Sequence, residues 1–252
     1  MLFSAARTPA DLAAMVDRRA SGLPLEHVLG WAEFCGLRIA VDPGVFVPRR
    51  RTEFLVRLVA DLAHLAASPA GRTLPRRRPV VVDLCCGSGA VGAALVAALD
   101  RVELYAVDID PAAVRCARRN VAAADGQVYE GDLYEPLPAT LRARVDVLVA
   151  NAPYVPTEAI RLLPPEARIH EPRVALDGGV DGLDVLRRVA AAAALWLAPG
   201  GHVLVETSER QAPQLVENAI RNGLIPRVAS SDKLNATVVI GTRPALQSGP
   251  GG

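Results

Sequence analysis

The stretch VVVDLCCGSGAVGAALVAAL, residues 80–99, decides the fold class of this chain. Its opening run, Val80–Leu84, is apolar and has the length of a buried strand. Glycines follow at positions 87 and 89, and the run Ala90–Leu99 is long enough for a helix. A strand, a glycine-rich turn and a helix in this order are typical of an open α/β sheet, whose ligands bind at the carboxyl ends of the strands.

Strands and helices continue to alternate after this unit. We expect further strands at Glu103–Val107, Gln127–Glu130, Val145–Ala150, Gly201–Glu206, Ile225–Ala229 and Ala236–Thr242, and helices at Pro111–Ala122, Gly182–Leu197 and Ala212–Asn222. This alternation predicts a doubly wound, mostly parallel sheet of seven strands.

The residues before this sheet follow a different pattern. A helix is expected at Pro9–Arg19, with Thr8 as its cap. Short alternating runs at Phe34–Val41 and Val45–Val47, on either side of Asp42-Pro43-Gly44, predict a hairpin. A second helix, capped by Thr52, is expected to run to about Ala66.

The composition of residues 68–79, with three prolines and four arginines, predicts a linker. We therefore expect an N-terminal helical and hairpin segment at 1–78 and an α/β domain at 79–243. Residues 244–252, rich in proline and glycine, are expected to be a disordered tail.

The overall charge argues against an extensive nucleic-acid-binding surface, because the formal net charge is +1. Residues 1–79 nevertheless carry 12 arginines and 7 acidic residues. This local excess of positive charge fits either a solvated surface or an acidic partner.

The N-terminal residues lack an apolar core long enough for a signal peptide. The apolar stretches 80–99 and 189–205 are interrupted by Asp83, glycines and Pro199, so neither predicts a membrane span. We expect a cytoplasmic protein without a membrane partner. The four cysteines form no C-x-x-C pair, and no metal site is expected.

The glycine turn matches the dinucleotide fingerprint G-x-G-x-x-G, which makes a nicotinamide-dependent oxidoreductase a rival hypothesis. Asp83 favours S-adenosylmethionine instead, because a carboxylate attracts the ammonium of a methionine group and repels a pyrophosphate. Asp108 follows the next strand and is placed to accept hydrogen bonds from two ribose hydroxyls. Asp132 is a candidate acceptor for an adenine amino group, with Leu133 packing on the ring. The predicted cofactor-binding set is Asp83, Cys85, Cys86, Gly87, Ser88, Gly89, Asp108, Asp132, Leu133 and Asn151.

A second motif, Asn151-Ala152-Pro153-Tyr154, follows the apolar run Val145–Ala150. Pro153 favours an extended Ala152, which leaves the Ala152 carbonyl free to point into a site. The Asn151 side-chain oxygen and this carbonyl are suited to accept both N–H bonds of a planar nitrogen, and Tyr154 to stack on the acceptor. Together with the glycine turn, these four candidate catalytic residues indicate methyl transfer from S-adenosylmethionine to a planar nitrogen.

Longer motifs resemble those of one enzyme family. They are PLEHVLG at 24–30, VDPGVFVPRRRTE at 41–53, EPRVALDGGVDGL at 171–183 and PGG at 199–201. With Asp83–Gly89, Asp108 and Asn151–Tyr154, they look like the signatures of the protein-(glutamine) methyltransferases of the HemK/PrmC type, across residues 22–242. The resemblance implies a class I, Rossmann-like methyltransferase that methylates a glutamine side-chain amide, in the best-known case the Gly-Gly-Gln glutamine of peptide-chain release factors.

The chain departs from this family's pattern at several positions. Ala152 replaces the first proline of N-P-P-Y, Arg50 and Arg51 replace a proline and an acid, and Asn235-Ala236-Thr237 replaces a usually charged segment. Few residues precede Pro24, where the family usually carries a longer helical docking domain, and the resemblance implies that residues 1–78 serve substrate docking. These departures indicate a divergent subfamily, whose protein substrate is a release factor, a ribosomal protein or another protein that presents a glutamine.

Two alternatives remain open from the sequence. Nucleic-acid amino methyltransferases use a similar clamp on a flipped base, so the main alternative is methylation of an adenine or guanine amino group. The near-neutral charge and the lack of an added basic domain weigh against it. The second alternative is a non-catalytic cofactor-binding module. The presence of the candidate cofactor-binding acids and of Asn151 argues against it.

Overall fold

A computed structural model of the protein describes residues 1–67 and 78–245. The predicted linker at 68–79 lies outside these residues, apart from Arg78 and Pro79. The predicted tail lies outside them from residue 246 onward.

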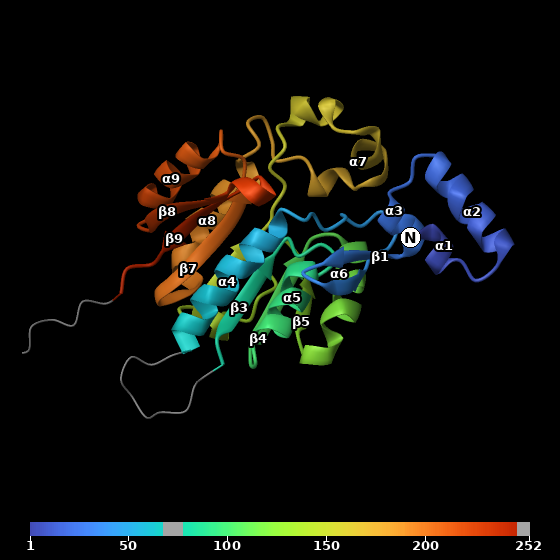
Figure 1. Ribbon diagram of the computed structural model, residues 1–252. Coiled ribbons are helices and arrows are strands. Elements are labelled where there is room, and N and C mark those ends of the chain that lie inside the picture. The colour runs from blue at the N-terminus through green and yellow to red at the C-terminus, as the bar shows by residue number, and fades with distance from the viewer. Residues whose placement is uncertain (68–77, 246–252) are drawn as a thin grey trace, which may run out of the picture.

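A seven-stranded sheet forms the centre of the molecule, in the order β5-β4-β3-β6-β7-β9-β8 (Figure 1). The neighbouring pairs from β5 to β7 are parallel, whereas β9 runs antiparallel to both β7 and β8. The strands are β3 (Val80–Leu84), β4 (Glu103–Asp108), β5 (Gln127–Glu130), β6 (Val145–Ala150), β7 (Leu197–Thr207), β8 (Ile225–Ser231) and β9 (Ala236–Thr242). The predicted doubly wound, mostly parallel sheet of seven strands is therefore confirmed.

Helices cover both faces of this sheet. One face packs on α4 (Thr52–Ala67), α5 (Ala90–Ala98) and α6 (Pro111–Val121), and the other on α8 (Asp184–Trp196) and α9 (Ala212–Arg221). The alternation within β3 explains this arrangement, because Val80, Val82 and Leu84 enter one core cluster and Val81 enters the other. Asp83 lies on the Val81 side, and this places its carboxylate beside α5.

The N-terminal hairpin differs from the prediction. It pairs β1 (Trp31–Phe34) with β2 (Leu37–Ala40) through a turn at Cys35 and Gly36. Both turn residues have positive φ, 51° and 75°, as a two-residue turn that matches the strand twist requires. The segment 42–44 also forms a turn, with Val45 N donating to Asp42 O at 3.1 Å, but Val45–Val47 does not continue as a strand.

The hairpin and α4 share the core of the sheet, since Phe34 and Ile39 pack in the same cluster as Leu55 and Leu95. Thr52, predicted as a cap, is the first residue of α4. The remaining N-terminal helices are α1 (Leu2–Ala5), α2 (Pro9–Ala20) and α3 (Leu25–Leu29). The predicted cap of α2 is confirmed, because the Thr8 side chain accepts from Asp11 N at 3.1 Å.

A long connection between β6 and α8 lies over the carboxyl ends of the strands (Figure 1). It contains η3 (Thr157–Leu162), α7 (Pro165–His170) and η4 (Arg173–Ala175). The short helical turns η1 (Ala122–Ala124), η2 (Ala139–Leu141) and η5 (Asp232–Leu234) lie in other loops. The connection therefore forms a roof over the edge where ligands bind in this fold.

Candidate active site

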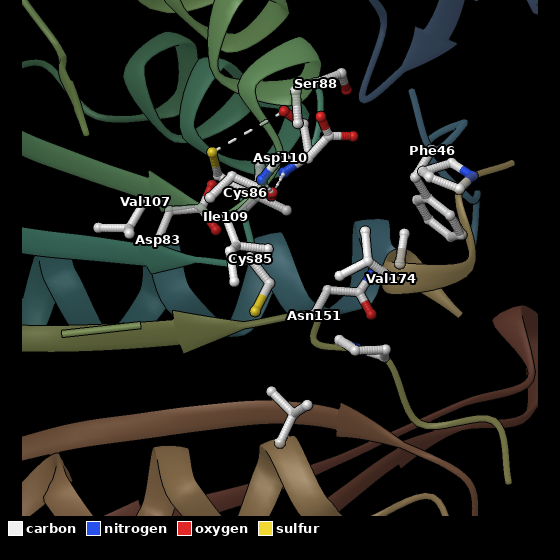
Figure 2. Close-up of a pocket in the computed structure, with 18 of the residues that line it drawn as sticks. Phe46, Asp83, Cys85, Cys86, Ser88, Val107, Ile109, Asp110, Asn151 and Val174 are labelled. Carbon is white, nitrogen blue, oxygen red and sulfur yellow. Dashed lines mark hydrogen bonds between the residues drawn. The ribbon is translucent and has the colours of Figure 1, made fainter. Parts of the chain in front are cut away.

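A first cavity opens at the carboxyl ends of β3, β4 and β6 (Figure 2). In this view Asp83, Cys85 and Cys86 lie on one side, and Phe46 and Val174 lie on the other. The predicted residues that line this cavity are Asp83, Cys85, Cys86, Gly87, Ser88, Asp108, Asp132, Leu133, Asn151 and Pro153. The sequence motifs thus converge on one place.

Asp83 is a buried carboxylate at the base of the first cavity, with 2% of its surface exposed. Its Oδ2 accepts a hydrogen bond from Gly92 N at 3.2 Å. Burial raises the pKa of Asp83 to about 7, and this single backbone donor lowers it only in part. A cationic ligand group beside Asp83 offsets the cost of ionising it.

The glycine turn brings the backbone close to this cavity. Cys85, Gly87 and Gly89 all have positive φ, at 56°, 55° and 77°. A Cβ added at Gly89 would lie 2.9 Å from Ala117 Cα, so only glycine lets α5 and α6 approach here. Cys85 and Cys86 face opposite ways, as predicted, with Cys85 against one core cluster and Cys86 in another, and all four cysteines are free thiols.

Asp108 fixes the turn from the end of the next strand. Its Oδ2 accepts from Gly87 N at 2.7 Å and its Oδ1 accepts from Asp110 N at 2.9 Å. Burial raises the pKa of Asp108, and these backbone donors lower it. Each carboxylate oxygen has a second lone pair, so the same side chain can hold the turn and still accept from a ligand.

Asp132 lies at the far wall of the first cavity and has a partner that the sequence did not indicate. Its Oδ2 lies 2.6 Å from Arg188 Nη2, which comes from α8. Leu133 beside it is buried, with a positive φ of 49°. One oxygen of Asp132 is therefore engaged by Arg188, and the other is the candidate ligand acceptor.

A second cavity lies on the other side of Asn151, under the roof between β6 and α8. It has a volume of about 620 Å³, in the range of ligand-binding clefts. Ala152 and Tyr154 line it, together with Glu171 and Glu206. Four residues line both cavities, and these are Phe46, Asn151, Pro153 and Ala175.

Asn151 is held at this junction by Thr52, the first residue of α4. The Asn151 side-chain nitrogen donates to Thr52 Oγ1 at 3.3 Å. Because the NH₂ end of the Asn151 amide faces Thr52, the oxygen end of the amide faces away from Thr52. The pair connects α4 to the end of β6.

Tyr154 is anchored at both ends. Its hydroxyl donates to Glu206 Oε1 at 3.3 Å, and its backbone oxygen accepts from Gln211 Nε2 at 3.0 Å. The Arg51 guanidinium lies 5.7 Å from the centre of its ring, within the range of a cation–π contact. Burial, and the nearby Glu206 carboxylate, raise the pKa of the hydroxyl, so Tyr154 is neutral and its ring forms a fixed wall of the second cavity.

The roof is tied to the N-terminal segment by a buried carboxylate. Glu171 accepts from Arg49 Nη2 at 2.7 and 2.6 Å through its two oxygens, and from Val47 N at 3.2 Å. Burial raises the pKa of Glu171, and Arg49 lowers it. This contact holds the segment 47–49 under the roof, where Phe46 can line both cavities.

Five residues at the site were not predicted from the sequence, namely Phe46, Glu171, Arg188, Glu206 and Gln211, and Thr52 was predicted only as a helix cap. Glu206 could have been found, since it stands at the carboxyl end of a predicted parallel strand, as Asp83 and Asp108 do. Arg188 had no such signal, because it lies on a helix among other charged residues. The predicted residue Gly89 lines neither cavity and instead packs against Ala117.

Within residues 1–67 and 78–245 no cluster of three or more His, Cys, Asp or Glu side chains is arranged to hold a metal ion. None of the helices described there is long and apolar enough to cross a membrane.

Comparison with known proteins gives three main findings. Residues 66–177 match the family model of the methyltransferase small domain. The release factor glutamine methyltransferase of Geobacter sulfurreducens is 38% identical over 240 residues, which cover 93% of this chain and 79% of that protein. The protein of the same name from Streptomyces coelicolor is 38% identical, over 80% of this chain and 68% of its own length.

Among solved structures, a methyltransferase from Pyrococcus furiosus superposes with a TM-score of 0.58. It is 16% identical and covers 92% of this chain and 99% of its own. This similarity is one of fold.

Proposed function

This chain belongs to the release factor glutamine methyltransferase family, and we propose that it methylates a glutamine side-chain amide of a translation-related protein such as a peptide-chain release factor. The chain is an S-adenosylmethionine-dependent methyltransferase. The observation that carries the proposed substrate is the junction of the two cavities at Asn151 and Pro153.

The groups around the first cavity fit S-adenosylmethionine. Asp83 forms no ion pair within the described residues, and its raised pKa makes an ammonium group a favourable partner. We assign Asp108 to the ribose hydroxyls, and Asp132 and Leu133 to the adenine. The turn at 85–89 supplies close backbone approach because Cys85, Gly87 and Gly89 adopt positive φ.

When bound, S-adenosylmethionine supplies a methyl group activated by its sulfonium. The chain itself needs to align the acceptor and exclude water. We assign the Asn151 side-chain oxygen and the Ala152 carbonyl as acceptors of the two amide N–H bonds, which aims the nitrogen at the first cavity. Tyr154 stacks on the amide plane, and the proton leaves to solvent after transfer.

Ala152 is compatible with this assignment because the group that acts is a backbone carbonyl. Pro153, which follows it, removes a backbone donor and keeps Ala152 extended. The departure from N-P-P-Y therefore leaves the acceptor geometry available.

A base-methylating function is not favoured. The two relatives that cover 93% and 80% of this chain are named for a glutamine of release factors, and the net charge of +1 offers little to a phosphate backbone. The nicotinamide hypothesis is also not favoured, since the relatives are methyltransferases.

We propose that residues 1–78 dock the protein substrate and that 79–243 form the methyltransferase domain. Helix α2 supports this, because it stands away from the sheet (Figure 1) and has no buried residue. Arg19 on α2 lies 2.9 Å from Glu166 on α7, and Glu166 lines the second cavity. A protein held by α2 is therefore adjacent to the acceptor side of the site.

The test offers methyl-labelled S-adenosylmethionine with three separate acceptors, which are purified release factor, ribosomes and total nucleic acid. We expect label on the release factor with wild-type protein and none with Asn151→Ala. Label on nucleic acid alone would contradict the proposal and favour the base-methylating alternative.

A further inference from the structure

Arg51 brings a positive charge to the acceptor side of the site. It immediately precedes α4 and lines the second cavity together with Asn151, Ala152 and Tyr154. Its side chain is 43% exposed. Position 51 is also one at which this chain departs from the family pattern, with an arginine in place of an acid. Any role of this charge in the acceptor site is therefore specific to this chain.

The partner of Arg51 is Glu206, a carboxylate near the end of β7 with 2% of its surface exposed. Arg51 Nε lies 3.3 Å from Glu206 Oε1. Among the residues that the structure describes, no second cation pairs with Glu206, and its buried Oε2 meets no hydrogen-bond donor. Because a buried carboxylate is costly to ionise without a paired cation, the charged form of Glu206 depends on Arg51.

Both members of this ion pair also contact Tyr154, the aromatic residue of the acceptor motif. Glu206 Oε1 accepts from the Tyr154 hydroxyl at 3.3 Å, and the Arg51 guanidinium lies over the Tyr154 ring, 5.7 Å from its centre. Each of the three side chains thus contacts the other two. Since an ionised carboxylate is a stronger acceptor than a neutral one, Arg51 holds the ring directly and holds its hydroxyl through Glu206.

We infer that Arg51 is a positioning residue that, together with Glu206, fixes the Tyr154 ring on which the methyl acceptor stacks. This inference rests on the proposed function, in which Tyr154 stacks on the glutamine amide. Without Arg51, Glu206 loses its cation, the hydroxyl bond of Tyr154 weakens and the cation–π contact is absent. The ring is then held less firmly, and the acceptor nitrogen is aimed less well at the first cavity.

Arg51→Met removes the charge and keeps an unbranched side chain. Because misplacing reacting groups by about 1 Å costs up to about 100-fold, we expect kcat with purified release factor to fall about tenfold. The affinity for S-adenosylmethionine should stay within about twofold of wild type, since Arg51 does not line the first cavity. Arg50→Met is the matched control, because Arg50 is exposed and lines neither cavity. Equal kcat in Arg51→Met and Arg50→Met would overturn the inference.

Two further variants test whether the charge acts through Glu206. Arg51→Lys keeps a cation for Glu206 and for the ring, so its kcat should lie closer to wild type than to Arg51→Met. In a Glu206→Gln background, Arg51→Met should lower kcat much less than it does alone, because the ion pair is already broken. A lysine variant as impaired as Arg51→Met, or losses that multiply in the double variant, would contradict the inference.

A second measurement needs no methyl acceptor. The chain has four tyrosines, so the NMR ring resonances of Tyr154 in ¹³C-tyrosine-labelled protein are identified by their absence in Tyr154→Phe. We expect Arg51→Met and Glu206→Gln to shift these resonances, and Arg50→Met to leave them unchanged. Unshifted Tyr154 resonances in Arg51→Met would overturn the inference even if no glutamine were methylated, whereas failure of the wild-type protein to methylate glutamine would reject the proposed function alone.

Discussion

At the scale of single residues, Asp108 joins the glycine turn to the first cavity. Its two oxygens already hold Gly87 N and Asp110 N, and we propose that they also accept from the ribose. Asp108→Ala should weaken S-adenosylmethionine binding by about 1.5–3 kcal/mol, the scale of hydrogen bonds to a charged group. Isothermal titration calorimetry measures this, with exposed Asp100→Ala as the control. Unchanged affinity in Asp108→Ala would refute the assignment.

Asp83 gives the site a pH dependence. Its pKa is raised to about 7 by burial, so below that pH the carboxyl is neutral and attracts an ammonium less. We expect the affinity for S-adenosylmethionine to increase as the pH rises through 7, with at most about a tenfold change per pH unit for one proton. Binding to Asp83→Asn should be weaker and nearly independent of pH from about 6 to 8. An equal pH dependence in wild type and variant would assign it to another group.

The raised pKa of Asp83 has the opposite effect on the stability of the ligand-free protein, which decreases as the pH rises. The folded state binds the Asp83 proton more tightly than the unfolded chain does, because its pKa is raised from 3.8 to about 7. The contribution of Asp83 to the free energy of unfolding therefore falls as the pH rises between these values. We expect the free energy of unfolding of Asp83→Asn, measured by denaturation, to increase relative to that of wild type as the pH rises toward about 7.

At the scale of elements, Gly89 connects the glycine turn to the packing of α5 on α6. Gly89→Ala would place a Cβ 2.9 Å from Ala117 Cα at a φ of 77°. Gly223 has a similar φ of 72° but no atom within 4 Å of an added Cβ, so Gly223→Ala is a matched control for backbone strain alone. We expect Gly223→Ala to lower the free energy of unfolding by about 1–3 kcal/mol. Gly89→Ala should lower it more and should also weaken cofactor binding. Equal losses in thermal denaturation would contradict the packing role.

The sequence predicted the sheet better than its surroundings. The central strands β3 and β6 are apolar runs followed by glycine or polar residues, and every residue in them is buried. The hairpin was misplaced because Asp42-Pro43-Gly44 has typical turn residues, whereas the real two-residue turn places Cys35 at positive φ. The roof at 155–183 has short helices and 3₁₀ turns with several prolines, and its sequence has no hydrophobic periodicity from which these elements could be predicted.

In the candidate site, the residues at strand ends were predicted from the sequence and those from loops and helices were not. Residues that end parallel strands, such as Asp83, Asp108 and Asn151, were found because strand ends meet at one edge. Phe46 and Arg188 come from a loop and a helix that only tertiary packing brings to this edge. Thr52 was visible in sequence as a helix start, but its contact with Asn151 joins residues 99 positions apart.

At the scale of the whole molecule, α1 and α2 stand apart from the core, and none of their residues is buried. Deletion of residues 1–20 should therefore leave thermal stability and cofactor affinity close to wild type. If this segment docks the substrate, the KM for an intact release factor should rise about tenfold, equivalent to about 1.4 kcal/mol. The kinetics with a short glutamine peptide should not change. An unchanged KM for the intact protein would reject a docking role for these helices.

The most direct test of the central claim locates the methyl group. Purified release factor is incubated with S-adenosylmethionine and either the wild-type protein or Asn151→Ala, and tandem mass spectrometry of the digested product assigns the modified atom. We predict one methyl group on the side-chain nitrogen of a glutamine with the wild-type protein, and none with Asn151→Ala, although that variant still binds the cofactor. Methylation of any other residue type, or equal methylation by Asn151→Ala, would contradict the account.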